Sequence, residues 1–307
     1  MRLLVVGAGA TGGYFGGRLA AAGRDVTFLI RPKRAAEIAK NGFVIADPKG
    51  ETRIEPKIVT ADALRGSYDL VLMSVKAYSL LAAMDDIAPV IGPDTLILPV
   101  LNGLKHFDML SERFGAERVI GSFCKINARL DDHGRIIQMS PLHDLIYGEY
   151  DGRRSPRIEA IDAFFKGAGF DARLSDDIGR ELWEKWVLLA TLGAATCLMR
   201  GTVGDIVARP GGRAFIEALL GEVTAVATAH GKAPDPTYLE TTRQLLTTPD
   251  SPMTASMYRD LIKGLPVEND EIIDDLLARA ASVGVKTPYF HLAAIHLGIY
   301  AAKRRSE

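Results

Sequence analysis

The first thirty-one residues constrain the fold more than any later part of the sequence. A short apolar strand, Leu3–Val6, runs into a turn with the spacing G-x-G-x-x-G, and a helical run to Ala22 and a second apolar strand follow. This order is the βαβ unit that binds dinucleotides, whose glycines allow a tight turn, a close approach to pyrophosphate and close helix packing. The residues predicted to contact a dinucleotide through this turn and the helix start are Gly7, Ala8, Gly9, Ala10, Thr11 and Gly12.

The residue at the end of the second strand predicts which dinucleotide binds. Enzymes that use NAD usually carry Asp or Glu there, which accepts hydrogen bonds from the ribose 2′-OH. This chain has Arg31, followed by Lys33 and Arg34. A guanidinium matches a phosphate in charge and in fork geometry, so we expect NADP rather than NAD. The alternative is a glycine-rich turn in an ordinary α/β protein. That alternative does not explain the further glycines of the same helix, which predict close packing on a sheet.

Composition limits the other function classes. The chain has 307 residues, 48% of them hydrophobic, and a net charge of −1, which fits two globular domains and gives no electrostatic case for nucleic acid. Cys124 and Cys197 are too few for a disulfide framework or a metal site, so we expect no metal and a reducing, cytoplasmic setting. The N-terminus reads as a strand rather than a signal peptide, and the longest apolar run, Trp186–Met199, is too short to span a membrane.

Strands alternate with helices through the first half of the chain. Asp69–Val75 and Thr95–Val100 are continuous apolar runs of the kind buried on both faces of a parallel sheet, and Arg53–Val59 reads as one short strand. The stretch from Arg118 to Tyr150 is also β-like. The pattern predicts an α/β fold with a Rossmann-like, doubly wound parallel sheet.

Beyond Asp176 almost every segment has a helical pattern. We therefore predict two domains, an NADP-binding Rossmann-like domain at residues 1–174 and an all-helical domain for substrate binding and catalysis at residues 175–307. Ligands of doubly wound sheets bind beyond the carboxyl ends of the strands. Arg31, Lys76 and Asn102 each follow such a strand end and are therefore predicted to face a ligand.

The helical half offers fewer chemical signals. Lys185 lies where a long apolar helix begins, and desolvation lowers the pKa of a lysine and makes it a better proton donor. Taken alone, these residues favour a lysine that snorkels to water. Glu268 could serve the dipole of the helix that it opens, and Ser256 could be either a helix N-terminal residue or a ligand donor.

Taken together, these blocks resemble the ketopantoate reductase family, the NADPH-dependent 2-dehydropantoate 2-reductases. The resemblance covers essentially the whole chain. It rests on Gly7–Gly12 with Arg31, Ser74–Tyr78, Leu101–Leu104, Leu182–Lys185, and Ser256–Asp260 with Gly264 and Glu268.

The resemblance implies an oxidoreductase with its active site between a Rossmann domain and a helical domain. Lys185 matches the catalytic lysine that binds the ketone oxygen and protonates it, and Glu268 matches a glutamate that orients substrate or the nicotinamide ribose. Asn102 matches an asparagine beside the nicotinamide, and Lys76 a lysine that contacts the cofactor. Ser256 matches a serine that helps to bind the substrate carboxylate.

The chain departs from the family at two positions. The family carries asparagines four and eight residues after the lysine, and both contact substrate; here those positions are Leu189 and Gly193. Two neutral hydrogen bonds of about 0.5–1.5 kcal/mol each correspond to roughly ten- to a hundredfold in affinity, enough to change substrate preference. Restoring both asparagines is therefore expected to tighten ketopantoate binding.

Three functions follow from these expectations. The first is NADPH-dependent reduction of 2-dehydropantoate to pantoate, in pantothenate and coenzyme A synthesis. The second is the same reaction on a more apolar 2-keto acid, which Leu189 favours. The third is a non-catalytic NADP(H)-binding regulator, against which the retained Lys185 and Glu268 argue. A small-molecule 2-keto acid is the expected partner, with neither nucleic acid nor membrane, and the oligomeric state stays open, a homodimer being one option.

Overall fold

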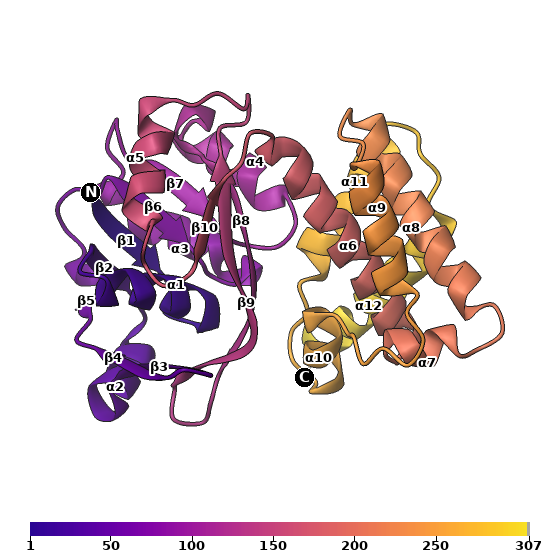
Figure 1. Ribbon diagram of the computed structural model, residues 1–307, viewed down its shortest axis with the longest axis horizontal. Helices are drawn as coiled ribbons and strands as arrows, with labels where there is room; N and C mark the ends of the chain where they lie inside the picture. Colours follow the sequence, from indigo (N-terminus) through magenta and orange to yellow (C-terminus); the bar gives the residue numbers. More distant parts are fainter. Residues whose placement is uncertain (306–307) are drawn as a thin grey trace. The chain divides into compact units, whose positions relative to one another are not determined.

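The computed structural model describes residues 1–305 of the chain. They form two compact units: unit 1 comprises Met1–Leu101 with His106–Ile178, and unit 2 comprises Asn102–Lys105 with the chain from Gly179 onward. Sheets with covering helices make up unit 1, and unit 2 is helical (Figure 1). The predicted fold class, a Rossmann-like parallel sheet followed by a helical domain, is confirmed. The proposed domain boundary after Leu174 stays a prediction.

The first sheet of unit 1 is wholly parallel and has the strand order β5-β2-β1-β6-β7. Val6, at the end of β1, pairs with Leu29 of β2 on one side and Met73 of β6 on the other. The carboxyl ends of these three strands are therefore neighbours. The strands are β1 (Arg2–Val6), β2 (Asp25–Leu29), β5 (Lys57–Val59), β6 (Leu70–Met73) and β7 (Leu96–Pro99).

A second, mixed sheet belongs to the same unit. Its order is β10-β9-β3-β4, and β8 pairs antiparallel with β9 as a long hairpin. The strands are β3 (Phe43–Asp47), β4 (Gly50–Ile54), β8 (Gly121–Leu130), β9 (Ile136–Gly148) and β10 (Asp171–Leu174).

The prediction of one strand over Arg53–Val59 is wrong. The segment is divided between β4, which pairs with β3 in the second sheet, and β5, which pairs with β2 in the first. Pro56 lies between them. Proline has no N–H to donate to a ladder, so the chain leaves one sheet there and joins the other.

Helix α1 (Ala10–Ala21) packs against both sheets through its glycines. A Cβ on Gly16 would lie 2.7 Å from the ring of Phe28 in the first sheet, and a Cβ on Gly17 would lie 2.9 Å from the ring of Phe43 in the second. Both distances are shorter than carbon atoms can approach. The close packing expected from these glycines is thus confirmed.

The remaining helices of the chain complete the two units. Those that begin before residue 170 are α2 (Pro32–Asn41), α3 (Leu80–Ile87), α4 (Lys105–Phe114) and α5 (Pro156–Phe165), with short 3₁₀ turns at η1 (Ala61–Ala63), η2 (Ala77–Ser79), η3 (Ala88–Val90) and η4 (Ala116–Arg118). Those that follow are α6 (Ile178–Met199), α7 (Val203–Val207), α8 (Gly212–Ala229), α9 (Pro236–Leu246), α10 (Ser256–Ile262), the π-helical turn η5 (Asp270–Asp274), α11 (Asp275–Ser282) and α12 (Pro288–Arg305).

Helix α6 is a long helix with many buried apolar residues. Trp186, Val187 and Cys197 on it are each at most 1% exposed. The helix begins at Ile178, eight residues before the apolar run that was predicted to be too short, so within residues 1–305 it is the one helix long and apolar enough to cross a membrane. In the structure 72% of its most apolar stretch is buried. This burial is that of a core helix.

Candidate functional site

The glycine-rich turn connects β1 to α1 in unit 1. Gly7 has a φ of +93°, and its N–H donates to the carbonyl of Leu29 at 3.0 Å, which fixes the turn against β2. Gly9 is the N-cap of α1, and no side chain caps the helix there. The first amides of α1 are therefore left for a ligand, and an anion is favoured at such an end.

Two glycines of the motif serve different purposes. A Cβ on Gly12 would overlap the carbonyl of Gly7 and the hydroxyl of Ser74, so this position has room only for hydrogen. A Cβ on Gly9 would meet nothing within 4 Å, so the turn is open on that side. The turn thus fits the pyrophosphate of a dinucleotide, which needs a close backbone approach.

Ser74 is a part of this turn that the sequence did not reveal as a site residue. It follows β6, and its hydroxyl lies 2.9 Å from the carbonyl oxygen of Val6 and 3.0 Å from that of Gly7, close enough to donate to either. The hydroxyl ties the end of β6 to the turn and occupies the space next to Gly12. The sequence placed Ser74 inside the predicted strand Asp69–Val75, whereas β6 ends at Met73 and leaves Ser74 at the strand end.

Arg31 lies where the sequence predicted, just after β2 and as the exposed N-cap of α2. Its guanidinium donates to the hydroxyl of Ser79 at 3.0 Å. Ser79 ends the turn η2 after β6, and Lys76 is the exposed N-cap of that turn. Arg31 and Ser79 therefore meet beyond the ends of β2 and β6, which flank β1. A guanidinium and a hydroxyl there can both donate to a phosphate.

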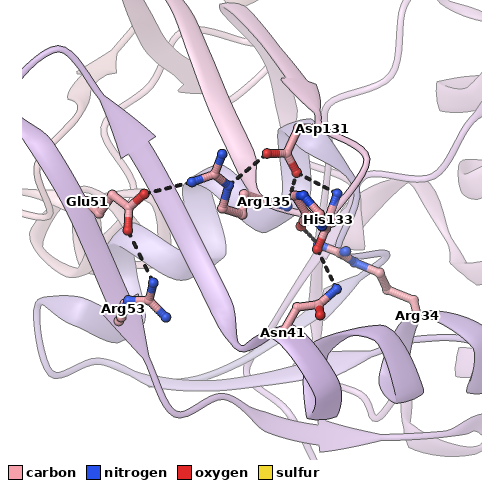
Figure 2. A network of polar contacts seen from close by, with 8 residues as sticks. Arg34, Asn41, Glu51, Arg53, Asp131, His133 and Arg135 are labelled. Atoms are coloured by element: carbon pink, nitrogen blue, oxygen red, sulfur yellow. Dashed lines mark hydrogen bonds and ion pairs between the residues drawn. The ribbon is translucent and has the colours of Figure 1, made fainter.

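Arg34 differs from Arg31 although both were read as one basic cluster. Its Nε donates to the carbonyl of Ala8 at 3.0 Å, one Nη donates to the carbonyl of Gly134 at 2.9 Å, and the other pairs with Glu37. Its side chain is only 14% exposed. Figure 2 shows it beside the turn of the β8–β9 hairpin. Arg34 is therefore engaged with the protein itself rather than open to a phosphate.

Lys185 and Asn102 lie together in unit 2. The ammonium of Lys185, half-buried on α6, donates to the Asn102 carboxamide oxygen at 3.2 Å. The two residues are far apart in sequence, and the contact brings a cation to the segment that follows Leu101.

The Asn102-Gly103 turn is held against the π-helical turn η5. Gly103 has a φ of +79°, and a Cβ there would overlap the backbone carbonyl of Glu271. Trp186, next to Lys185 on α6, donates its indole N–H to the Ile272 carbonyl at 3.1 Å. Isolated π-helical turns are frequent at functional sites. Here η5 contacts both the Asn102-Gly103 segment and Trp186 of α6.

Acidic side chains surround the start of η5. Glu268 is 7% exposed, and its carbonyl accepts from the N–H of Ile272 at 3.3 Å. Burial raises the pKa of Glu271, as do the neighbouring carboxylates of Asp270 and Glu268, whereas Lys105 lowers it. The field of these carboxylates favours a cation near them.

The lysine-bearing face of α6 becomes apolar beyond Lys185. Leu189 and Gly193 follow at four-residue intervals and so lie on the same face, roughly 6 and 12 Å along the helix. Leu189 is half-buried, whereas Gly193 is buried under α10: a Cβ there would lie 2.8 Å from the terminal methyl of Met257. Ser256, the residue before, is the exposed first residue of α10.

Comparison with known proteins identifies this arrangement. Residues 3–152 match the family model described as ketopantoate reductase PanE/ApbA, and residues 177–298 match the model of the C-terminal part of the same family. The chain belongs to the ketopantoate reductase family. The resemblance drawn from the sequence motifs is thereby confirmed, and so is the prediction of an oxidoreductase that uses a nicotinamide cofactor.

Relatives in this family align along nearly the full chain. An uncharacterized oxidoreductase, YkpB, of Bacillus subtilis is 35% identical over 99% of this chain and 100% of its own. A 2-dehydropantoate 2-reductase of Mesorhizobium japonicum is 28% identical over 94% of both chains. The crystal structure of 2-dehydropantoate 2-reductase from Geobacter metallireducens is 30% identical, with a TM-score of 0.87 over 97% of this chain and 99% of its own.

The predicted ketopantoate reductase residues fall into two groups. In unit 1 the Gly7–Gly12 turn, Arg31 and Lys76 lie at adjoining strand ends. In unit 2 the contacts join Asn102 to Lys185 and Gly193 to α10. Their functional roles stay predictions.

Proposed function

We propose that this chain reduces a 2-keto acid to a 2-hydroxy acid with NADPH, with 2-dehydropantoate as the first candidate substrate and Lys185 as the proton donor. The observation that carries the proposal is the hydrogen bond of 3.2 Å from Lys185 to Asn102, because it holds an ammonium at the start of the largely apolar part of α6. Family membership supports it, as do relatives named 2-dehydropantoate 2-reductase that span almost the whole chain. A regulator would need neither Lys185 nor Glu268.

The chain's own residues account for the chemistry at the ketone. A bound nicotinamide supplies a hydride for the ketone carbon. The Lys185 ammonium binds the ketone oxygen, its charge stabilises the negative charge that develops there, and it then gives up a proton. Asn102 accepts a hydrogen bond from the ammonium and so holds it in place. Glu268 is proposed to orient substrate or ribose, and Ser256 to bind the carboxylate.

The test of this proposal is NADPH oxidation by the purified protein. We expect turnover with 2-dehydropantoate or another 2-keto acid, and none with simple aldehydes or ketones that lack the carboxylate. Binding of NADPH with no turnover of any keto acid would favour the regulator.

The proposed choice of NADPH rests on Arg31 and its contact with Ser79. Arg31→Asp places a carboxylate where a phosphate is expected, removing a charged hydrogen bond of about 1.5–3 kcal/mol. The Michaelis constant for NADPH should rise roughly 10- to 100-fold, and that for NADH should change little. Lys40→Ala, which removes an exposed cation in the last turn of α2, is the matched control and should change neither. An equal rise in the Michaelis constants for NADPH and NADH would contradict the assignment of Arg31 to the 2′-phosphate.

A more apolar 2-keto acid is the second candidate substrate, and the packing of Gly193 favours it. The terminal methyl of Met257 occupies the space into which a side chain at position 193 would project, and Met257 is 3% exposed. The face of α6 beyond Lys185 therefore offers Leu189 and a buried thioether rather than hydrogen-bond donors. Such a surface suits a substrate without a distant hydroxyl.

This packing changes the expected result of restoring the two family asparagines. Leu189→Asn alone should favour 2-dehydropantoate, by roughly fivefold for one neutral hydrogen bond. Gly193→Asn alone should not help, because its carboxamide meets Met257. Gly193→Asn with Met257→Ala should add a further gain. The ratio of kcat/KM for 2-dehydropantoate to that for 2-ketoisovalerate measures the change, and a gain from Gly193→Asn alone would contradict the packing argument.

A further inference from the structure

The turn between β8 and β9 is held together by hydrogen bonds among its own residues. The Asp131 carboxylate accepts from the backbone N–H groups of His133 at 3.0 Å and Arg135 at 2.8 Å, and from Arg135 Nε at 2.7 Å. Although burial opposes it, these hydrogen bonds hold the pKa of Asp131 down at about 2. Arg135 also reaches Glu51 on β4 at 2.9 Å. The turn thus keeps its shape over the physiological pH range.

This turn is fastened to α2 at two points (Figure 2). Arg34 donates to the Gly134 carbonyl at 2.9 Å, and Asn41 donates to the His133 carbonyl at 2.8 Å. Gly134 has a φ of +76°, and a Cβ on it would meet the Arg34 guanidinium and the Glu37 carboxyl group. The backbone conformation therefore favours glycine at this position, and a larger residue would displace the ends of the Arg34 and Glu37 side chains.

The same guanidinium reaches the glycine-rich turn. Its Nε donates to the Ala8 carbonyl at 3.0 Å, and Ala8 is 3% exposed. In a trans peptide the C=O and the following N–H point in opposite directions within one plane. Holding the Ala8 carbonyl therefore fixes the direction of the Gly9 N–H, on the residue whose side-chain position is open.

We propose that Arg34 is a positioning residue for the cofactor: it uses the β8–β9 turn as a fixed support to aim the Gly9 amide at the pyrophosphate. The proposal rests on the cofactor part of the proposed function. In this proposal Arg34 has a different role from Arg31, which is exposed and donates a hydrogen bond to Ser79. Pyrophosphate is common to NADPH and NADH, so the effect of Arg34 should be the same for both.

The test measures cofactor binding without substrate, by titrating NADPH and NADH against protein fluorescence. Arg34→Gln should raise both dissociation constants by about tenfold, the equivalent of one charged hydrogen bond. Arg34→Lys keeps a cation and an aliphatic stem but lacks the fork that reaches two carbonyls, so it should give a similar loss. Arg53→Gln is the matched control. Arg53 is an exposed arginine of the same network, and among the residues drawn in Figure 2 it contacts only the side chain of Glu51.

Hydrogen exchange of the protein without cofactor provides a second readout. The amides of residues 7–12 should exchange faster in both Arg34 variants and at the wild-type rate in Arg53→Gln. A loss restricted to NADPH would make Arg34 a ligand of the 2′-phosphate and overturn the proposal, as would unchanged affinity and exchange. If the wild type bound neither cofactor, the proposed function would fail, whereas the exchange measurement would still decide whether Arg34 orders the turn.

Discussion

Replacing Lys185 by methionine should lower kcat by roughly 10³-fold and leave the affinity for NADPH nearly unchanged. The lysine is proposed both to stabilise the developing alkoxide and to supply its proton, and each of these effects contributes about 10²-fold or more in enzymes that use it. Methionine has a similar length and can remain in the same packed position on α6. Single-turnover rates with saturating NADPH and substrate measure the loss.

Two further variants separate charge from proton transfer. Lys185→Arg keeps the cation but holds its proton too tightly to release it near neutral pH, so it should recover substrate binding and little of the rate. Lys263→Met removes an exposed lysine at the end of α10 and should behave as wild type. Turnover by Lys185→Met within tenfold of wild type would rule out the assigned role.

Gly103→Ala should disable the same site through the backbone. An L-residue at a φ of +79° is strained by roughly 1–2 kcal/mol, and its Cβ would also overlap the Glu271 carbonyl, for which overpacking adds about 1–3 kcal/mol. The Asn102-Gly103 segment must then move away from η5, taking Asn102 away from Lys185. We expect a loss of kcat of at least a hundredfold, together with a lower melting temperature.

Gly231→Ala provides the matched control for the strain alone. Gly231 also lies in unit 2 with a φ of +70°, and a Cβ there would meet nothing within 4 Å. Gly231→Ala should lose less stability than Gly103→Ala and should keep its activity. If the two variants lost the same stability and both kept full activity, the contact between Gly103 and η5 would have no part in the site.

Much of unit 1 could be predicted because its signals are local. The glycine spacing, the two flanking apolar strands and the buried runs at β6 and β7 each lie within a few residues, and period and turn chemistry determine them. The division of Arg53–Val59 between two sheets could not be predicted in the same way. Both halves have strand character. β4 pairs with β3, its neighbour in the sequence, whereas β5 joins the other sheet by pairing with β2, which is distant in the sequence and which no local pattern predicts.

The residues of the candidate site also differ in whether local or long-range contacts place them. Arg31 follows a strand end, so its position beside the glycine-rich turn could be predicted. Arg34, three residues later, has the same chemistry, yet its partners Ala8 and Gly134 come from distant parts of the chain. The Lys185–Asn102 contact and the methyl of Met257 over Gly193 are likewise long-range. Motif resemblance pointed to Lys185 and Asn102, but no local pattern predicted what fills the space at Gly193.

Hydride transfer from NADPH to carbon 2 of a 2-keto acid can be followed with a deuterium label. NADPH carrying deuterium on the transferred position of its nicotinamide is incubated with the purified protein and 2-dehydropantoate or 2-ketoisovalerate, and the product is examined by mass spectrometry and NMR. We predict a 2-hydroxy acid with one deuterium on carbon 2 and loss of that product in Lys185→Met. Bound but unconsumed NADPH, or a reduced product without deuterium on carbon 2, would show that the protein does not transfer a hydride to the keto carbon.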